Sequence, residues 1–353
     1  MNIPHRRLHQ VPCMALLSRL IQLACFALHV GAADAAEPPG PIIGKVEPGT
    51  RAQGQAHVTL LTALPWLSDW KGSRLEEIRL VEQKPDQTWP TGLPPAWWAK
   101  VVGPRGGTGY LAWDSTGSGR LLEFAFDAPL AVATPSAKVL AGVPALQQFP
   151  IPQIGGPPIA SGCVPTAGAS VLGFWIAHGQ PQWRGDAGTH LLQDFARRLR
   201  SRLKMEPVPD KDGYTEDGLT LAGAMPQDLA RAIQVDADAH QVPLASQWHR
   251  FNFDTLKSEI EAGRPCVASC TVRLPHKPHL SWGHEVAAVG WMQLDGSAFV
   301  GVSDNFYPTR TPDAVRWICA SAFNSLITVR PATAGATKES ITTAPSPLGI
   351  SGG

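Results

Sequence analysis

The chain has 353 residues, a formal net charge of +1 and an apolar content of 44%. Its length favours two domains, and its apolar content is ordinary for a globular protein. A nearly neutral chain gives no reason to expect nucleic acid or an anionic membrane as a partner, because both attract an excess of basic residues.

The first 36 residues have the three parts of a secretory signal peptide. A basic start at His5-Arg6-Arg7 precedes a mostly apolar stretch over residues 14–30, and small residues around Ala35 offer cleavage sites. Arg19 interrupts the apolar stretch, which argues against a membrane-spanning helix. We therefore expect a secreted or periplasmic protein, with no stable membrane insertion after the signal is removed.

Residues 37–145 are expected to form a β-rich N-terminal domain, after an irregular start over 37–56. Alternating or apolar runs predict strands at 57–61, 77–82, 98–102, 109–113 and 121–126. A segment of this kind is compatible with a structural domain, with a propeptide that covers a site, or with a ligand-binding module. We favour the structural domain.

The stretch that begins at Cys163 predicts a buried helix with a cysteine at its start. Pro165 suits the first turn, where its missing N–H is not needed, and Gly179 is suited to end the helix. Apolar residues between them cover nearly the whole circumference, which indicates burial. Backbone N–H groups at the positive end of a helix favour the thiolate that a nucleophile requires. A buried structural cysteine is the alternative.

Helices and strands of a second domain follow this stretch. Helical spacing of apolar residues predicts an amphipathic helix over 191–203, whose basic residues we assign to its solvated face. Pro226 opens a second helix, and Asn252 or Asp254 caps a third. Apolar runs predict strands at 266–272, 315–318 and 325–329. Residues 332–353 have the composition of a disordered tail.

His284 stands at the start of another strand-like run, over residues 284–290. Asp295-Gly296 is typical of a tight hairpin turn, and residues 298–302 predict the returning strand. Such a hairpin brings Asp304, just after the second strand, close to His284. A thiolate nucleophile needs a base and an orienting group, and His284 and Asp304 can fill these roles for Cys163. A histidine hydrogen-bonded at a strand end is the alternative.

These residues, in this order, resemble the pattern of the peptidase C39-like family, which consists of papain-like cysteine peptidases. The family pattern is a glutamine, then Gly-Cys-Gly-Pro-Thr/Ala opening a buried helix, then Gly-His with a strand, then a strand that ends in Asp. The matching residues here are Gln153, Gly162-Cys163-Val164-Pro165-Thr166, Gly283-His284 and Ser303-Asp304. The resemblance extends over residues 148–331, roughly half of the chain.

The resemblance implies a role for each matching residue. Cys163 would be the nucleophile, His284 the base and Asp304 the orienting group. The amide of Gln153, together with the backbone N–H of Cys163, would stabilise the oxyanion. Gln147 and Gln148 are competing candidates for that amide.

Val164 departs from the family pattern, which most often has glycine at this position. A valine narrows the approach of a substrate to the backbone beside the nucleophile and is stiff at χ1. It therefore predicts a preference for small residues beside the scissile bond. It also favours an alternative function, a catalytically inactive papain-like binding protein. A thiol-dependent acyl transferase, in which an amine replaces water, is a further alternative.

Neither the other cysteines nor the other histidines predict a second site. Cys266 and Cys270 cannot bond to each other on one strand, because four extended residues span about 13 Å. Pairing of one of them with Cys319 and free buried thiols are both compatible with the sequence. His276 and His279 precede His284, but the second histidine of the zinc-protease motif is missing. We expect neither a metal nor a cofactor.

The sequence thus predicts an α+β protein with four parts. These are a signal peptide at 1–36, a β-rich domain at 37–145, a papain-like domain at 146–331 and a tail at 332–353. In the papain-like domain, a central helix packs on an antiparallel sheet. The expected function is that of an exported cysteine peptidase or amidase, which hydrolyses a peptide-type bond in a peptide or protein substrate.

Overall fold

The computed structural model describes residues 46–81, 94–129, 133–153, 156–207, 215–216, 219–220, 222–274, 277–305 and 314–332. The chain divides into two compact units, residues 1–45 and 46–353, and every described residue belongs to the second. The predicted signal peptide and nearly all of the predicted tail lie outside the described residues. The described part is a mixed α+β structure with a large antiparallel sheet and several helices.

The secondary structure is as follows. The described α-helices are α2 (Pro48–Thr62), α3 (Cys163–Ala177), α4 (Leu191–Arg202), α5 (Pro226–Ala239) and α6 (Phe253–Glu261). The described 3₁₀ helices are η1 (Pro65–Trp70), η2 (Pro181–Arg184) and η3 (Ala320–Ala322). The large sheet contains β1 (Arg74–Val81), β2 (Ala96–Val102), β3 (Thr108–Asp114), β4 (Leu121–Pro129), β5 (Ala133–Thr134), β6 (Ala137–Val139), β13 (Leu244–Arg250), β14 (Cys266–Leu274), β15 (Lys277–Leu294), β16 (Ser297–Ser303), β17 (Ala314–Cys319) and β18 (Phe323–Pro331). A four-stranded sheet contains β7 (Pro150–Gln153), β8 (Gly156–Ala160), β10 (Thr215–Glu216) and β11 (Leu219–Thr220), and a two-stranded sheet pairs β9 (Glu206–Pro207) with β12 (Ala222–Gly223).

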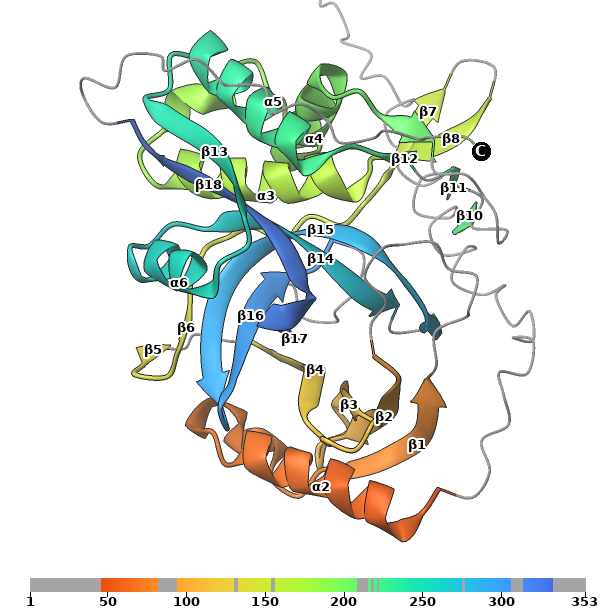
Figure 1. Cartoon of the computed structure of the whole chain (residues 1–353). Coiled ribbons are helices and arrows are strands. Elements are labelled where there is room, and N and C mark those ends of the chain that lie inside the picture. Colours follow the sequence, from red (N-terminus) through yellow and green to blue (C-terminus); the bar gives the residue numbers. More distant parts are fainter. Residues whose placement is uncertain are drawn as a thin grey trace, which may run out of the picture. The chain divides into compact units, whose positions relative to one another are not determined.

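The main path of the large sheet has the order β1-β2-β3-β4-β17-β16-β15-β14-β18-β13. The sheet curves strongly between its two ends, with α3, α4 and α5 gathered near β13 and β18, α2 near β1 and α6 near β15 (Figure 1). β4 and β17 join the first four strands to the rest, with Phe124 opposite Trp317. The strands on either side of the expected boundary at residue 145 therefore belong to one sheet and one compact unit.

Helix α2 corrects the expectation for the start of this unit. An irregular segment was expected over 37–56 and a strand over 57–61, but residues 48–62 are helical. Pro48 lies in the first turn, where proline is tolerated. Gly54, Val58 and Leu61 recur at helical spacing and are buried against the sheet. The β-branched residues of this stretch favoured a strand, but the spacing of its buried face belongs to a helix.

The other four strands predicted in the first part of the chain are confirmed as β1 to β4, and the hairpin predicted in the second part is confirmed as β15 and β16. Aromatic side chains tie the two parts into a single core. The ring of Phe124 on β4 stacks on that of Trp317 on β17, with centroids 6.2 Å apart. Trp66 contacts the same tryptophan, with centroids 5.8 Å apart. Strands from both parts thus share the burial of the same large apolar surface.

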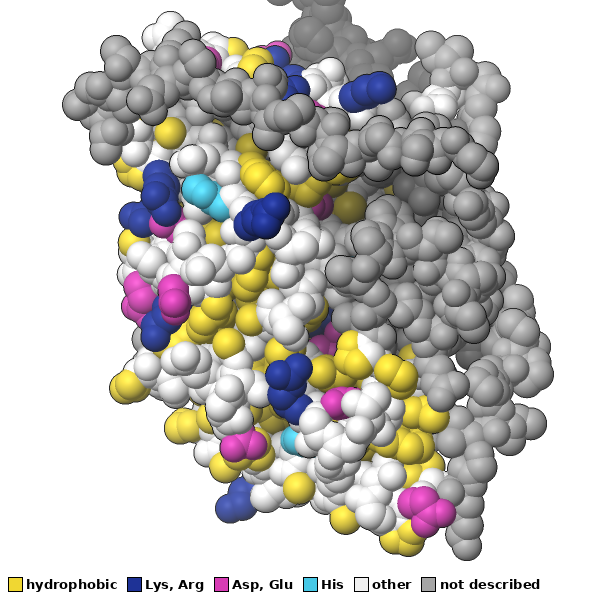
Figure 2. Space-filling view, viewed as in Figure 1, with side chains coloured by type: hydrophobic (Ala, Val, Ile, Leu, Met, Phe, Trp, Pro, Cys, Tyr) yellow, Lys and Arg dark blue, Asp and Glu magenta, His cyan; other side chains and the backbone are white. Residues whose placement is uncertain are grey.

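The surface carries charges of both signs. On the face shown in Figure 2, the basic and acidic side chains of the described residues are dispersed among hydrophobic and other side chains. No described helix combines the length and the apolar composition that a membrane crossing needs.

We expect a fragment that begins at Leu146 to aggregate, because it lacks β1 to β6. Loss of β4 leaves the edge of β17 unpaired and uncovers the aromatic surface around Trp317. Light scattering after size-exclusion chromatography measures the monomer fraction. The control is a chain that ends at residue 332 and keeps every described element, and it should remain monomeric. A monomeric Leu146 fragment with cooperative unfolding would show instead that the first strands are a separable domain or propeptide.

Candidate functional site

Cys163 is the first residue of α3, and the local sequence determines where that helix begins. Gly162 before it has a φ of 89°, a left-handed conformation that glycine adopts without steric strain. The Thr166 hydroxyl donates to the Gly162 carbonyl oxygen at 2.6 Å and lies 2.9 Å from the Ser161 hydroxyl. No described side chain caps this N-terminus. The first N–H groups of the helix therefore stay available to a thiolate or to a substrate oxygen.

Close packing holds α3 in place. Residues 164–175 of the helix are all buried, between the sheet on one side and helices α4 and α5 on the other. Gly168 permits this approach, because a Cβ atom there would lie 2.8 Å from Leu199 Cδ1 and 3.0 Å from Leu229 Cδ1. Since protein interiors are densely packed, the position of Cys163 is set by the whole core around α3.

The β15–β16 hairpin brings His284 and Asp304 together as predicted. Asp295 and Gly296 have φ values of 48° and 70°, which suit the two central positions of a type I′ turn. Asp304 directly follows β16, and its Oδ1 lies 2.9 Å from Nε2 of His284. Both side chains are buried, at 3% and 1% exposure. Their juxtaposition is confirmed, whereas their chemical roles remain predictions.

Cys163 completes a set of three side chains drawn from α3, β15 and the segment after β16. Its side chain is half-buried and interacts with the His284 imidazole through a hydrogen bond and through charge. Burial alone lowers the pKa of His284, but Asp304 and Cys163 together raise this pKa to about 10. The imidazole is therefore protonated at neutral pH, which is the form that stabilises an adjacent thiolate.

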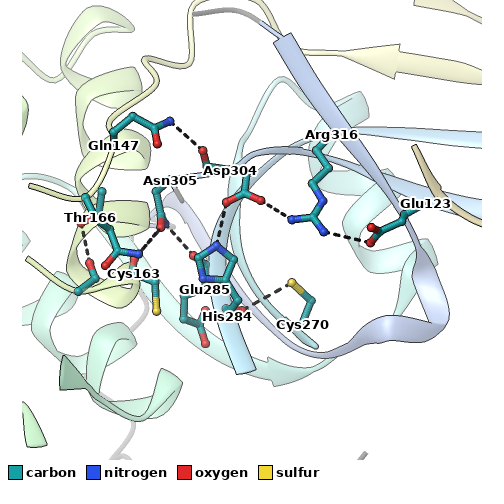
Figure 3. A network of polar contacts seen from close by, with 12 residues as sticks. Glu123, Gln147, Cys163, Thr166, Cys270, His284, Glu285, Asp304, Asn305 and Arg316 are labelled. Atoms are coloured by element: carbon teal, nitrogen blue, oxygen red, sulfur yellow. Dashed lines mark hydrogen bonds and ion pairs between the residues drawn. The ribbon is translucent and has the colours of Figure 1, made fainter. Parts of the chain in front are cut away.

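A buried arginine holds the other oxygen of Asp304. Nη1 of Arg316 donates to Oδ2 of Asp304 at 2.6 Å, and Nη2 of the same arginine donates to Glu123 at 3.0 Å (Figure 3). Burial by itself raises the pKa of Asp304, but His284 and Arg316 together hold that pKa well below its usual range. Asp304 therefore remains a carboxylate that accepts hydrogen bonds from both neighbours.

Asn305 connects the helix to the hairpin. Its Nδ2 donates to the carbonyl oxygen of Cys163 at 3.2 Å and to that of Glu285 at 2.8 Å. Its Oδ1 accepts from the Gln148 amide at 3.1 Å. The Gln147 amide donates to the backbone carbonyl of Asp304 at 3.0 Å. These bonds fix the positions of the start of α3, β15 and the segment after β16 relative to one another.

Gln153 does not share these contacts. It ends β7 in the four-stranded sheet, its side chain is exposed, and no hydrogen bond between described residues joins it to Cys163, His284 or Asp304. Its oxyanion role therefore stays a prediction. The competing candidates Gln147 and Gln148 are both hydrogen-bonded next to the site.

The expectation for Val164 needs correction. Its side chain is only 2% exposed and belongs to the main hydrophobic core. A side chain buried in the core does not narrow an approach from solvent, so the structure removes this basis for a preference for small substrates. Residues 164–175 of α3 are buried on every face of the helix, so the Val164 side chain points into the core.

Glu285 is a second buried acid beside the three side chains. It accepts a hydrogen bond from the Ser269 hydroxyl, which also contacts the Ser325 hydroxyl. Its Oε2 is buried and has no hydrogen-bond partner among the described residues. Burial raises the pKa of Glu285 to about 7, although Ser269 and the charge of His284 oppose this rise. Glu285 therefore changes its charge within the neutral pH range.

The remaining cysteines and histidines add no further site. Cys266, Cys270 and Cys319 are buried free thiols. Burial raises the pKa of both Cys266 and Cys270 well above that of an ordinary thiol. Within the described part of the chain, no group of acidic, histidine or cysteine side chains could hold a metal ion. His276 and the side chain of His279 lie outside that part.

Sequence reasoning missed Arg316, Glu123, Asn305 and Glu285. A signal for the first two was present, because each is a charged residue inside an otherwise apolar strand. A buried charge is very unfavourable unless it is paired, so two such residues of opposite sign predict a partner for each other. Their proximity depends on the pairing of β4 with β17, which joins distant segments and carries no local signal.

Comparisons with known proteins assign no function to this site. No family model matches the chain, and no curated protein matches its sequence. The resemblance to the peptidase C39-like family therefore depends on the motifs quoted above.

Glu285→Gln should change how stability depends on pH. The unfolded carboxyl ionises near 4.5, whereas the folded one keeps its proton until about pH 7. The stability that the neutral carboxyl contributes is therefore complete below pH 4.5 and is lost as pH rises through about 7. The free energy of unfolding, measured with urea, should therefore fall between pH 5 and pH 8 by about 2 to 3 kcal/mol more in the wild type than in Glu285→Gln.

Glu261→Gln is the matched control for this titration. Glu261 is a half-exposed glutamate at the end of α6, so Glu261→Gln shows the effect of the same substitution outside the buried interior. Parallel pH dependences for Glu285→Gln and the wild type would contradict the assignment of a neutral buried carboxyl to Glu285.

Proposed function

We propose that the chain is an exported cysteine peptidase or amidase that hydrolyses a peptide-type bond and is related to the peptidase C39-like family. Cys163 is the nucleophile in this proposal, His284 transfers protons and Asp304 orients the imidazole. The observation that supports it most is the unbroken series of side-chain contacts from Cys163 through His284 to Asp304. A cysteine at the start of a central helix that packs on an antiparallel sheet also agrees with a papain-like catalytic domain.

Each step of the proposed hydrolysis has a group to perform it. The Cys163 sulfur attacks the carbonyl carbon, a C–S bond forms and negative charge moves to the carbonyl oxygen. The His284 imidazolium gives its proton to the leaving nitrogen as the C–N bond breaks, which leaves a thioester on Cys163. Water then attacks the thioester while His284 takes a proton from it. The C–S bond breaks, which releases the acid and restores the thiolate.

The orientation of the imidazole supports these proton transfers. Nε2 of His284 is engaged by Asp304, which leaves Nδ1 for the thiol and the leaving group. The oxyanion is stabilised in this proposal by the backbone N–H of Cys163 and by a glutamine amide, for which Gln153 is the first candidate and Gln147 and Gln148 are the competing ones. A peptide or protein in the secreted or periplasmic space is the proposed substrate, because the first 36 residues have the pattern of an export signal.

Alkylation of the folded chain with iodoacetamide tests the nucleophile. Cys163 is half-buried beside an imidazolium, whereas Cys266, Cys270 and Cys319 are buried. Cys163 should therefore react at neutral pH at least about tenfold faster than the other three. His284→Gln should slow Cys163 because the imidazolium is lost, although its greater exposure remains. Peptide mapping by mass spectrometry measures each rate, and urea-unfolded protein, in which all thiols are exposed, is the control. Equal rates in the folded chain would contradict an activated Cys163.

Turnover of a broad peptide library tests the reaction itself, with Cys163→Ala as the inactive control. Release of a carboxylic acid from the wild type alone supports hydrolysis. An amide formed with an added amine indicates acyl transfer. An unreactive library together with selective alkylation of Cys163 would favour a binding protein that retains the arrangement without turnover.

A further inference from the structure

A buried row of alternating charges extends from the three side chains to the first strands of the chain (Figure 3). Asp304 uses one carboxylate oxygen for His284 and the other for Arg316. Arg316 in turn donates to Glu123 at 3.0 Å. These four side chains are each no more than 4% exposed. From imidazolium to glutamate, the charges run positive, negative, positive and negative.

Strand pairing explains how the row forms. β4, β17, β16 and β15 are consecutive in the sheet. Glu123, Arg316 and His284 lie within β4, β17 and β15, and Asp304 directly follows β16. Glu123 lies two positions along β4 from the residue that pairs with Arg316, and Asp304 lies two positions beyond the residue of β16 that pairs with it. Such diagonal neighbours have Cα atoms about 7 to 8 Å apart, which an arginine side chain spans.

Stability alone does not account for this row. Removing charges from water is so unfavourable that a buried ion pair is often no more stable than apolar residues of similar volume. Arg316 and Glu123 each lie between apolar neighbours on their strands, where apolar residues would pack readily. What the pair adds at this place is a fixed guanidinium on the second oxygen of Asp304 and a carboxylate that balances its charge.

We propose that Glu123 and Arg316 are positioning residues for the His284–Asp304 pair, so that a strand from the first part of the chain completes the site. Arg316 keeps the Asp304 carboxylate oriented toward Nε2 of His284. Glu123 balances the charge of Arg316, which otherwise weakens the attraction of Asp304 for the imidazolium. The catalytic consequence rests on the proposed function, whereas the effect on His284 can be measured without any substrate.

Other titratable side chains face this row from four elements, and they are Cys163 of α3, Tyr110 of β3, Cys270 of β14 and Glu285 of β15. Burial lowers the pKa of Arg316, but Glu123, Tyr110 and Asp304 raise it well above that of an ordinary arginine. Arg316 is therefore charged at every pH of the test. The variants that test the row change only Glu123 and Arg316, so the contributions of the other groups are common to them and to the wild type.

Nuclear magnetic resonance of carbon-13-labelled histidine measures the titration of His284, whose signal is assigned by its loss in His284→Gln. Glu123→Gln leaves the charge of Arg316 unbalanced and should lower the His284 midpoint by about one pH unit, a tenfold change in proton affinity. Adding Arg316→Gln in the same chain removes that charge and should reverse part of the shift, because the double variant still lacks the side chain that orients Asp304. Glu123→Asp keeps the carboxylate and should also retain it. A residue with a merely structural role would not give shifts that reverse in the double variant.

Glu259→Gln is the matched control. Glu259 is a buried glutamate on α6 that pairs with Arg264 and Arg330, each at 2.7 Å, away from the row. Its replacement should lower stability and leave the His284 midpoint unchanged. An unchanged midpoint in Glu123→Gln, or an equal shift in Glu259→Gln, would overturn the positioning role.

Alkylation of Cys163 in the same variants separates the two proposals. Reactive Cys163 with an unmoved His284 midpoint overturns the positioning role alone. Unreactive wild-type Cys163 with a shifted midpoint in Glu123→Gln overturns the proposed function alone. Should Glu123→Gln fail to fold, Arg316→Lys is measured in its place. Lysine keeps the positive charge but cannot hold both carboxylates with one planar group, so a positioning role predicts a lowered His284 midpoint, and a wild-type midpoint would overturn that role.

Discussion

A protonated imidazole buried against a carboxylate is the interaction on which the rest of this structure depends. His284 and Asp304 are almost fully covered, and burial of either charge alone is strongly unfavourable. Each is stable as an ion because the next side chain has the opposite sign, and the series ends at Glu123 on β4. Four neighbouring strands must therefore be in register for the imidazole to keep its proton. The single sheet formed by strands from both parts of the chain meets this requirement.

A rigid element then brings the sulfur to this pair. Cys163 opens a helix that is buried along nearly its whole length, so its position follows from core packing and not from a mobile loop. Asn305 adds a direct link, since it binds the carbonyl oxygens of both Cys163 and Glu285. The segment after β16 thus has two functions. It supplies Asp304 to the imidazole, and it fixes the distance between the helix and the strand that carries His284.

The predictable features of the site had local causes. The Asp-Gly turn and two apolar runs predicted the hairpin, and the hairpin predicted that Asp304 lies beside His284. Pro165 and the apolar stretch after it predicted α3 and its burial. The features that the sequence did not predict depend on contacts between distant segments. The environment of Arg316 follows from the pairing of β17 with β4, and the inward direction of Val164 follows from helices that cover α3. Helix α2 was missed because β-branched residues near its end favoured a strand.

The proposed function requires Cys163 and His284 to form a thiolate–imidazolium pair at neutral pH, held by the charges of Asp304, Arg316 and Glu123. The ultraviolet absorbance of a thiolate measures this pair directly, as the difference between the wild type and Cys163→Ala. A thiolate signal of about one equivalent is expected at pH 7, and it should fall in His284→Gln because the counter-charge is lost. A difference spectrum that shows no thiolate at pH 7, and gains one only under the alkaline conditions that ionise any free cysteine, would contradict the proposed function.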